Sequence, residues 1–329
     1  MIKIALVGLG LVAELAHLPS FHKNKKVRII ALCDLDKKKL KKFSKKYKIK
    51  KIYTSYRKLI IENKLDGVVI TVNKEVITKV AKEFLMSGIP VFSEKPVALS
   101  YKKADELNKL TLKKKIGFMI GYMKKFDDGI LKLKKVIKKN SMGILNSVYY
   151  ENFEGNSYKN PSLKLIKKKI SVRRNKKYYY IKYLNSFCHS INLIRDLFGN
   201  IVLTSSRLNN IGEGIVIFKS KIINIIFNNK YSKINGWHEK IHLNYEKGKI
   251  IVNMPPPLQK NTSATITIKN YNTNTTKALY INKNGWSFEN QANAFIKLIE
   301  RKKINKSQNS IIESLMDIQI IEKIFNIKR

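Results

Sequence analysis

The first 122 residues alternate short apolar runs with segments of helical periodicity. The runs have the length of buried strands and cover residues 2–7, 27–33, 68–72, 89–93 and 116–122. Between the runs, apolar positions recur three or four residues apart, most clearly from Ile77 to Leu85. Strands that alternate with helices at these intervals predict an α/β domain over residues 1–122, with a doubly wound parallel sheet.

The pattern changes after residue 122. The predicted elements are, in order, helix 128–139, strand 144–154, helix 184–198, short β-rich runs within 201–281, and helices 288–302 and 308–326. We therefore expect a second domain over residues 123–329, of α+β class, with a mostly antiparallel open sheet backed by helices on one face. The two final helices are expected to pack back toward the first domain.

A glycine motif joins the first predicted strand to the helix that follows it. Residues 8–13 are Gly-Leu-Gly-Leu-Val-Ala, the G-x-G-x-x-A pattern of dinucleotide-binding turns. The glycines permit a tight turn and let backbone N–H groups approach a diphosphate at the helix N-terminus. Asp34 ends the second strand 24 residues after Gly10, where such turns place an acidic residue. The first domain is therefore predicted to be a Rossmann domain.

Asp34 favours NAD as the cofactor. Its carboxylate can accept hydrogen bonds from the adenosine ribose hydroxyls, and its charge repels the 2′-phosphate of NADP. The alternative is that Asp34 is a turn residue and that the lysines at 37–39 accept a phosphate, in which case NADP would bind.

Two further positions carry candidate chemistry. Lys95 follows a predicted strand at the carboxyl edge of the sheet, where an ammonium group would stabilise a developing alkoxide; the alternative is a solvated surface lysine. On helix 184–198, Asn185, His189, Asn192 and Asp196 share one polar face. Periodicity alone indicates a solvated face, but a histidine titrates near neutral pH and is a suitable proton acceptor for alcohol oxidation.

The order of motifs resembles the Gfo/Idh/MocA oxidoreductase family, which includes glucose-fructose oxidoreductase and inositol dehydrogenase. The resemblance is carried by G-x-G-x-x-A, then EKP followed by ALS, then GYMKKFDD, H-x-x-x-x-x-R-D-L-F-G and the closing WSFENQANAFIKLIE. It covers essentially the whole chain.

The resemblance implies roles for individual residues. It places Lys95 beside the nicotinamide and the substrate hydroxyl, and it maps an acid-base D-x-x-x-H pair onto Asn185 and His189, with asparagine where aspartate is usual. The expected catalytic residues are Lys95, His189 and Asn185. The expected cofactor contacts are Gly8, Gly10, Leu11, Val12, Asp34, Thr71, Asn73, Glu94 and Lys95. The expected substrate contacts are Lys95, Tyr122, Asn185 and His189. Ile77 is a second departure, since many relatives carry histidine there.

The high positive charge of the chain suggests two other classes of partner. Sixty-six Lys and Arg against 23 Asp and Glu give a net charge of +43, which would suit nucleic acid or an anionic membrane. Arginine is scarce, however, and Lys, Asn, Ile and Tyr are residues that A+T-rich codons encode. We interpret the charge as codon bias and expect no specific nucleic acid partner. A nucleotide-sugar diphosphate could instead dock on basic residues 164–177, which include Arg173 and Arg174, or that segment is a solvated loop.

Composition and residue spacing also bear on membrane insertion, cellular location and metal binding. No run of 18 apolar residues occurs, so no membrane-spanning helix is predicted. Cys33 and Cys188 are far apart, which fits a reducing compartment and a cytoplasmic location. Histidines at 17, 22, 238 and 242 lack ligand spacing, so no metal is expected.

Together these features predict an NAD-dependent oxidoreductase. It would transfer a hydride between nicotinamide and a secondary alcohol or ketone of a sugar, nucleotide sugar or cyclitol. The alternative is a non-catalytic regulatory protein that binds NAD and a sugar, which Asn185 favours. The family resemblance implies a homodimer or homotetramer built on the open face of the second sheet.

Overall fold

The computed structural model describes residues 1–139, 141–154, 176–221, 223–231, 236–279, 285–301 and 311–327. The chain forms two compact units. The first contains Met1–Phe126 and Ser287–Gln319, and the second contains Asp127–Trp286 and Ile320–Lys328. The first unit thus extends beyond residue 122, because the 3₁₀ turn η2 (Met123–Phe126) and α9 (Ser287–Arg301) contact each other within it.

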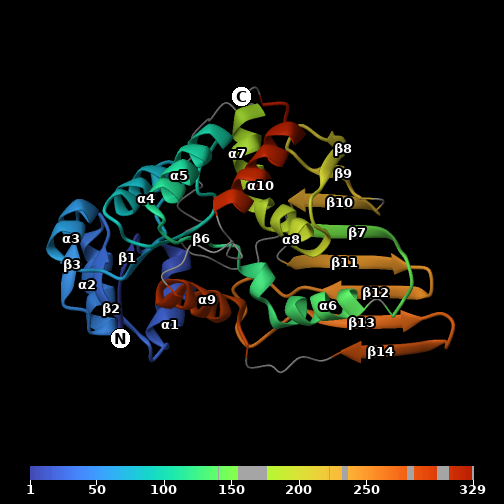
Figure 1. The fold of residues 1–329 in the computed structure, drawn as a ribbon, viewed down its shortest axis with the longest axis horizontal. Coiled ribbons are helices and arrows are strands. Elements are labelled where there is room, and N and C mark those ends of the chain that lie inside the picture. Colours follow the sequence, from blue (N-terminus) through green and yellow to red (C-terminus); the bar gives the residue numbers. More distant parts are fainter. Residues whose placement is uncertain are drawn as a thin grey trace. The chain divides into compact units, whose positions relative to one another are not determined.

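The first unit is built on a parallel sheet of the order β3-β2-β1-β4-β5-β6 (Figure 1). Its strands are β1 (Ile2–Val7), β2 (Val27–Cys33), β3 (Lys51–Tyr53), β4 (Gly67–Ile70), β5 (Val91–Ser93) and β6 (Phe118–Ile120). The doubly wound parallel sheet predicted from the sequence is confirmed. Several strands are shorter than their apolar runs; the run at 116–122, for example, continues past β6 into the turn that carries Tyr122.

Helices cover the sheet of the first unit. They are η1 (Ala13–His17), α1 (Leu18–His22), α2 (Lys37–Tyr47), α3 (Tyr56–Glu62), α4 (Ile77–Met86), α5 (Tyr101–Lys114) and α9; α10 (Ile311–Ile324) is divided between the units. Phe21, Phe92 and Phe295 meet edge to face with ring centroids 5.6–6.3 Å apart, which packs α1 and α9 against β5. This core fixes the carboxyl edge of the sheet on which the candidate site lies.

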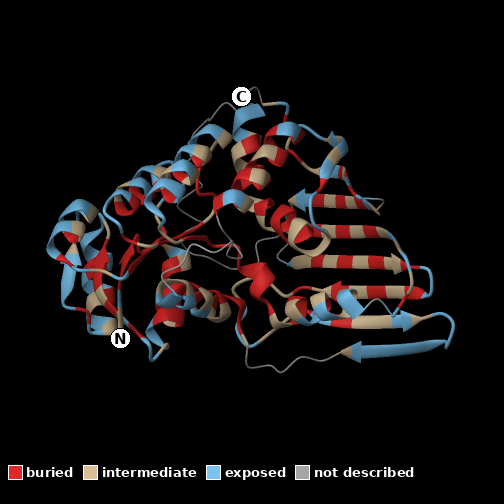
Figure 2. Cartoon of the chain, viewed as in Figure 1, coloured by how far each residue is buried: buried red, intermediate tan, exposed pale blue. Residues whose placement is uncertain are grey.

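The second unit is built on an eight-stranded sheet of the order β14-β13-β12-β11-β7-β10-β9-β8. Its strands are β7 (Leu145–Glu154), β8 (Val202–Leu208), β9 (Gly214–Ser220), β10 (Ile223–Tyr231), β11 (Trp237–Tyr245), β12 (Gly248–Asn253), β13 (Thr265–Asn270) and β14 (Thr275–Leu279). β7 and β10 are parallel, and the other neighbouring strands are antiparallel, so the predicted mostly antiparallel sheet is confirmed. Buried residues alternate with half-buried ones along the central strands (Figure 2), as a sheet packed on one face requires.

The helix predicted over 184–198 is wrong in one respect. The structure has two helices there, α7 (Lys176–Ser186) and α8 (Cys188–Phe198), with a turn at Phe187. Phe187 keeps right-handed helical dihedrals (φ −91°, ψ −1°), and its N–H still donates to the carbonyl of Tyr183. The hydrophobic period therefore runs through the break, and the sequence pattern cannot reveal it.

Two other expectations can be compared only with the residues that the structure describes. The basic segment 164–177 lies outside them except for Lys176 and Lys177. Across the part of the chain that the structure describes, no helix is both long enough and apolar enough to cross a bilayer. The remaining helix of the second unit is α6 (Asp128–Lys139).

Candidate functional site

The turn after β1 requires glycine at one position and leaves open space at another. Gly8 has φ +92°, and a Cβ there would lie within 2.8 Å of the backbone of Thr71 and Val72. The Thr71 hydroxyl donates to the Gly8 carbonyl at 2.6 Å, which holds the turn against the end of β4. A Cβ on Gly10 would meet no atom within 4 Å. The surface above Gly10 is thus open to a ligand at the start of the helix, which suits the N–H groups that bind a diphosphate.

A cavity of about 440 Å³ begins at this turn and extends past the ends of β2 and β4. Five of the residues predicted to contact the cofactor line it, namely Gly8, Gly10, Asp34, Thr71 and Asn73. Leu11, Val12, Glu94 and Lys95 are not among its lining residues. The volume and the glycine turn at one end fit the adenosine half of a dinucleotide.

Asp34 faces this cavity and also supports the turn. Its Oδ2 accepts the N–H of Leu9 at 2.5 Å, and its Oδ1 accepts the N–H of Asp36 at 2.8 Å. Each carboxylate oxygen has a second lone pair, so Asp34 can still accept hydrogen bonds from ribose hydroxyls. Lys39 and Lys79 line the same cavity and supply positive charge.

The sequence analysis missed part of the cavity wall. Leu35 is 87% exposed between two aspartates, and Val76 is 46% exposed at the start of α4; both line the cavity. Tyr56 lines it as well, and its hydroxyl donates to Glu83, which Arg57 binds through two nitrogens at 2.7 Å. A leucine between two aspartates was a usable signal in the sequence, but Tyr56 follows no motif.

Cys33 contributes a thiol to the wall of this cavity. Burial, and then the neighbouring charge of Asp34, raise the pKa of its thiol to about 12. The side chain is therefore a neutral apolar wall at physiological pH.

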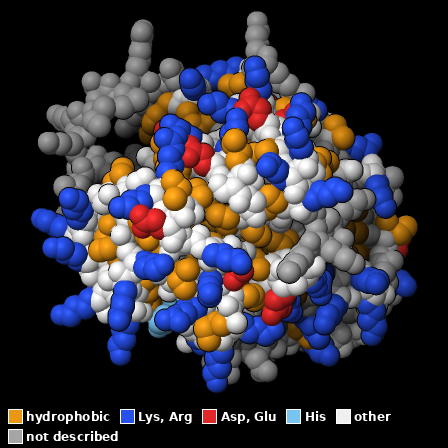
Figure 3. All heavy atoms as spheres, turned by 60° about the vertical axis from the view of Figure 1, so that its left-hand side comes forward, with side chains coloured by type: hydrophobic (Ala, Val, Ile, Leu, Met, Phe, Trp, Pro, Cys, Tyr) orange, Lys and Arg blue, Asp and Glu red, His pale blue; other side chains and the backbone are white. Residues whose placement is uncertain are grey.

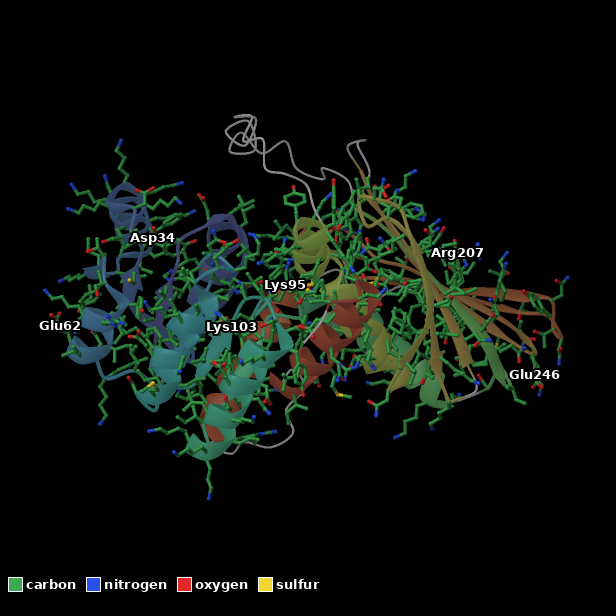
Figure 4. All side chains as sticks on the ribbon, turned by 90° about the horizontal axis from the view of Figure 1, so that it is seen from above. Asp34, Glu62, Lys95, Lys103, Arg207 and Glu246 are labelled. Carbon is green, nitrogen blue, oxygen red and sulfur yellow. The ribbon has the colours of Figure 1, made fainter. Side chains whose placement is uncertain are left out.

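Lys95 lies at the same sheet edge, after β5, and is half-buried. The preceding Glu94 is buried, with Oε1 2.7 Å from Nε2 of His17 and Oε2 accepting the N–H of Lys95 at 3.2 Å. Asp34 and Lys95 follow strands that are three places apart in the sheet, or about 14 Å at the usual strand spacing (Figure 4). Tyr122 is fully buried in this unit, and its hydroxyl lies 3.1 Å from Oγ of Ser314.

The second unit holds the other expected residues. Asn185 is exposed in the last turn of α7, and His189 is half-buried in the first turn of α8. The solvated face that periodicity alone indicates does not continue beyond this point, because Asn192 is buried and Asp196 forms an ion pair with Lys134 at 2.5 Å. The structure thus brings Gly8, Gly10, Asp34, Thr71 and Asn73 around one cavity, whereas Lys95 belongs to the first unit and His189 to the second. Among the described residues, no group of three His, Cys, Asp or Glu could hold a metal ion.

A doubly wound sheet with a glycine turn, an open cavity and an acidic residue after β2 is typical of dinucleotide-binding proteins. Residues 2–122 match the family model described as an oxidoreductase family with an NAD-binding Rossmann fold. Over these residues the match confirms the resemblance to the Gfo/Idh/MocA family that was inferred from the sequence.

Known proteins share part of this sequence or the fold. Inositol 2-dehydrogenase of Salmonella typhimurium is 29% identical over 168 residues, which are 49% of this chain and 49% of that protein. The match thus spans about half the length of that relative. A dehydrogenase from Clostridium difficile has the same fold, with a TM-score of 0.79, 19% identity and 99% of each chain covered. A 3-ketoreductase from Actinomadura kijaniata, solved with NADP and TDP-benzene, has a TM-score of 0.79 at 12% identity, covering 98% of this chain and 96% of that one.

Proposed function

We propose that this protein uses NAD to oxidise a secondary alcohol of a sugar, nucleotide sugar or cyclitol, or to reduce the corresponding ketone. The observation that carries the proposal is the cavity between Gly10 and Asp34, at the sheet edge that also bears Lys95. The name of one relative, inositol 2-dehydrogenase, supports the substrate class.

The cavity suggests how the cofactor would be held. The N–H groups after Gly10 would bind the diphosphate, and the Asp34 carboxylate would accept hydrogen bonds from the adenosine ribose. Leu35 and Val76 supply the exposed apolar side chains that an adenine ring would cover. When bound, NAD supplies a hydride acceptor at its nicotinamide ring. Asp34 also carries the preference for NAD over NADP in this proposal, because a 2′-phosphate would approach its charge.

Lys95 and His189 would handle the proton of the substrate hydroxyl. An ammonium group at Lys95 stabilises negative charge that develops on the substrate oxygen, and the imidazole of His189 accepts the proton. Asn185 can orient an imidazole but carries no charge to stabilise its protonated form. The residue therefore sets a limit on how strongly His189 can act as a base.

The exposed Asn185 is also the observation that favours the second candidate, a regulatory protein that binds NAD and a sugar without turnover. One variant distinguishes the two candidate functions. If the protein is an enzyme, native protein reduces NAD with a polyol; if it has lost turnover through this position, only Asn185→Asp does so.

The test is steady-state reduction of NAD at 340 nm with a panel of cyclitols, aldoses and nucleotide sugars. We expect turnover with at least one of them, and a fall in kcat on the order of 10²-fold in His189→Ala and in Lys95→Met with little change in NADH affinity. Lys103→Met and His22→Ala are matched controls, because both side chains are exposed and lie outside the proposed chemistry. Normal turnover of His189→Ala would reject the role of His189.

We also propose a homodimer or homotetramer formed through the outward face of the eight-stranded sheet. The half-buried residues Ile217, Ile226, Tyr149, His242 and Ile251 are cross-strand partners in one row over β9, β10, β7, β11 and β12. A mostly apolar row of this width is a surface that a second copy could cover.

A further inference from the structure

His17 is a buried polar residue that the reaction proposed above does not use. It is 2% exposed and ends η1, the turn that follows the glycine motif. Its ring meets those of Phe92 and Phe288 edge to face, with centroids 5.2 and 5.5 Å away. A phenylalanine or leucine would suit such an apolar environment better, so the imidazole calls for a polar reason.

That reason is the carboxylate of Glu94. Nε2 of His17 lies 2.7 Å from Oε1 of Glu94, a distance typical of a charge-assisted hydrogen bond. The other oxygen, Oε2, accepts the backbone N–H of Lys95 at 3.2 Å. A Cβ on Gly121 would stand 3.0 Å from Oε1, so the carboxylate is closed in from a third side. Glu94 therefore has one defined position, and Lys95 is attached to it directly.

The other end of this chain of contacts is the glycine turn. The N–H of Glu14 donates to the carbonyl of Gly10 at 3.0 Å, and the N–H of Leu18 donates to the carbonyl of Ala13. The second bond spans five residues, so η1 is a π-helical turn with one more residue than an α-helical turn. Such turns change the direction of the side chains that follow, and here His17 points at the end of β5.

We propose that His17 is a positioning residue that acts through Glu94 on Lys95. It links the turn expected to bind the diphosphate to the lysine expected to face the substrate hydroxyl. The proposal rests on the proposed function, because it assumes that Lys95 takes part in the reaction. It also assigns the Glu94 carboxylate to this internal role and away from direct contact with the cofactor.

The variants separate the hydrogen bond from the volume of the ring. His17→Leu removes the bond to Glu94 and fills the space, whereas His17→Gln keeps an N–H donor. Gly121→Ala pushes on the Glu94 carboxylate from the opposite side without changing His17. Phe288→Leu is the control, because it removes a ring contact of His17 and leaves the bond to Glu94 intact.

Two readouts test the proposal. The first is competitive acetylation of the Lys95 amine, measured by mass spectrometry relative to the exposed Lys103 of the same protein. The second is kcat with NADH affinity measured separately by calorimetry. We expect His17→Leu and Gly121→Ala to change the relative reactivity of Lys95 and to lower kcat on the order of 10-fold to 100-fold at nearly unchanged NADH affinity. His17→Gln should have a Lys95 reactivity and a kcat close to those of the native protein. Phe288→Leu should leave both quantities unchanged.

Unchanged acetylation of Lys95 in both His17→Leu and Gly121→Ala would overturn the proposal. If His17→Leu does not fold, His17→Phe, which fills the same apolar space without a donor, takes its place. The acetylation readout needs no turnover, so it separates a failure of this proposal from a failure of the proposed reaction.

Discussion

At the scale of single residues, Asp34 combines a structural and a selective role. Its carboxylate binds the N–H groups of Leu9 and Asp36 and faces a cavity that Lys39 and Lys79 also line. Removing its charge should therefore leave two lysines available to a 2′-phosphate. The discrimination between NAD and NADP depends, in this account, on one carboxylate.

We expect native protein to bind NADH more tightly than NADPH, and Asp34→Asn to narrow the ratio of the two dissociation constants by about 10-fold, or 1.4 kcal/mol. The substituted amide would keep a carbonyl oxygen for one of the two backbone N–H groups, so the glycine turn should persist. Asp34→Ser, which is shorter, should also weaken NADH binding. Isothermal calorimetry measures these dissociation constants, and native protein that prefers NADPH would contradict the assignment.

Cys33 gives a prediction about pH. Because burial raises the pKa of its thiol from 9.0 to about 12, the folded state holds the proton more tightly than the unfolded state does. The stabilisation is fully present below pH 9.0 and is lost as the pH rises toward about 12. We expect iodoacetamide to leave Cys33 unmodified in native protein at neutral pH and to modify it in denaturant, as peptide mass spectrometry would report. Rapid alkylation of the native protein would show that the thiol is neither buried nor protonated.

At the scale of elements, Asp127 shows how one side chain joins two segments. Its Oδ1 accepts N–H groups from Gly129 and Ile130 at the start of α6 and from Ala264 before β13. Burial raises the pKa of the Asp127 carboxyl, and the three N–H groups oppose that rise. Asp127→Ala would leave three buried donors without their acceptor.

We expect Asp127→Ala to lower the free energy of unfolding by about 2 kcal/mol or more, and Asp127→Asn to lower it less because an amide oxygen still accepts. Asp36→Ala is the matched control, because Asp36 caps α2 at an exposed position, where about 1 kcal/mol is usual. Urea denaturation followed by circular dichroism measures these values. Equal losses for Asp127→Ala and Asp36→Ala would show that the link to Ala264 contributes nothing.

The same scale shows what sequence patterns could and could not predict. β1 and β2 followed from continuous apolar runs, because consecutive residues of these strands are buried, and α4 followed from apolar spacing, because it buries one face. β3 escaped notice because Lys51 and Ile52 are exposed and the strand has only three residues. The turn at Phe187 escaped it because helical dihedrals and spacing continue through the break between α7 and α8.

For the candidate site, local motifs sufficed for the glycine turn and Asp34, whose spacing is fixed by one strand-turn-helix unit. His17 and Glu94 are 77 positions apart in sequence, and nothing in either segment indicates the contact. Tyr56 lines the cavity, and its hydroxyl is bonded to Glu83 on another helix. Pairings that the tertiary fold creates are therefore the part that sequence reasoning lacks.

At the scale of the whole molecule, charge and association are the open properties. Lys and Arg side chains are dispersed over the face drawn in Figure 3 and form no single stripe there, which favours codon bias over a nucleic-acid surface.

The proposed interface makes a prediction about self-association. We expect light scattering to give the mass of a dimer or tetramer, and Ile226→Lys to lower that mass toward the mass of a monomer. Ile61→Lys makes the same substitution at an 83% exposed position of α3 in the first unit, so it should leave the mass unchanged. A native monomer at all concentrations would contradict the proposed interface.

The central claim is hydride transfer between NAD and a sugar-type alcohol. Its most direct measurement uses polyols deuterated at their carbinol carbons, incubated with the protein and NAD, followed by mass spectrometry of the nicotinamide product. We predict deuterium in the NADH formed from at least one polyol, with a rate of label transfer on the order of 10²-fold lower when Lys95→Met replaces the native protein. Tight NADH binding without transfer of deuterium from any polyol, in both native protein and Asn185→Asp, would contradict the account.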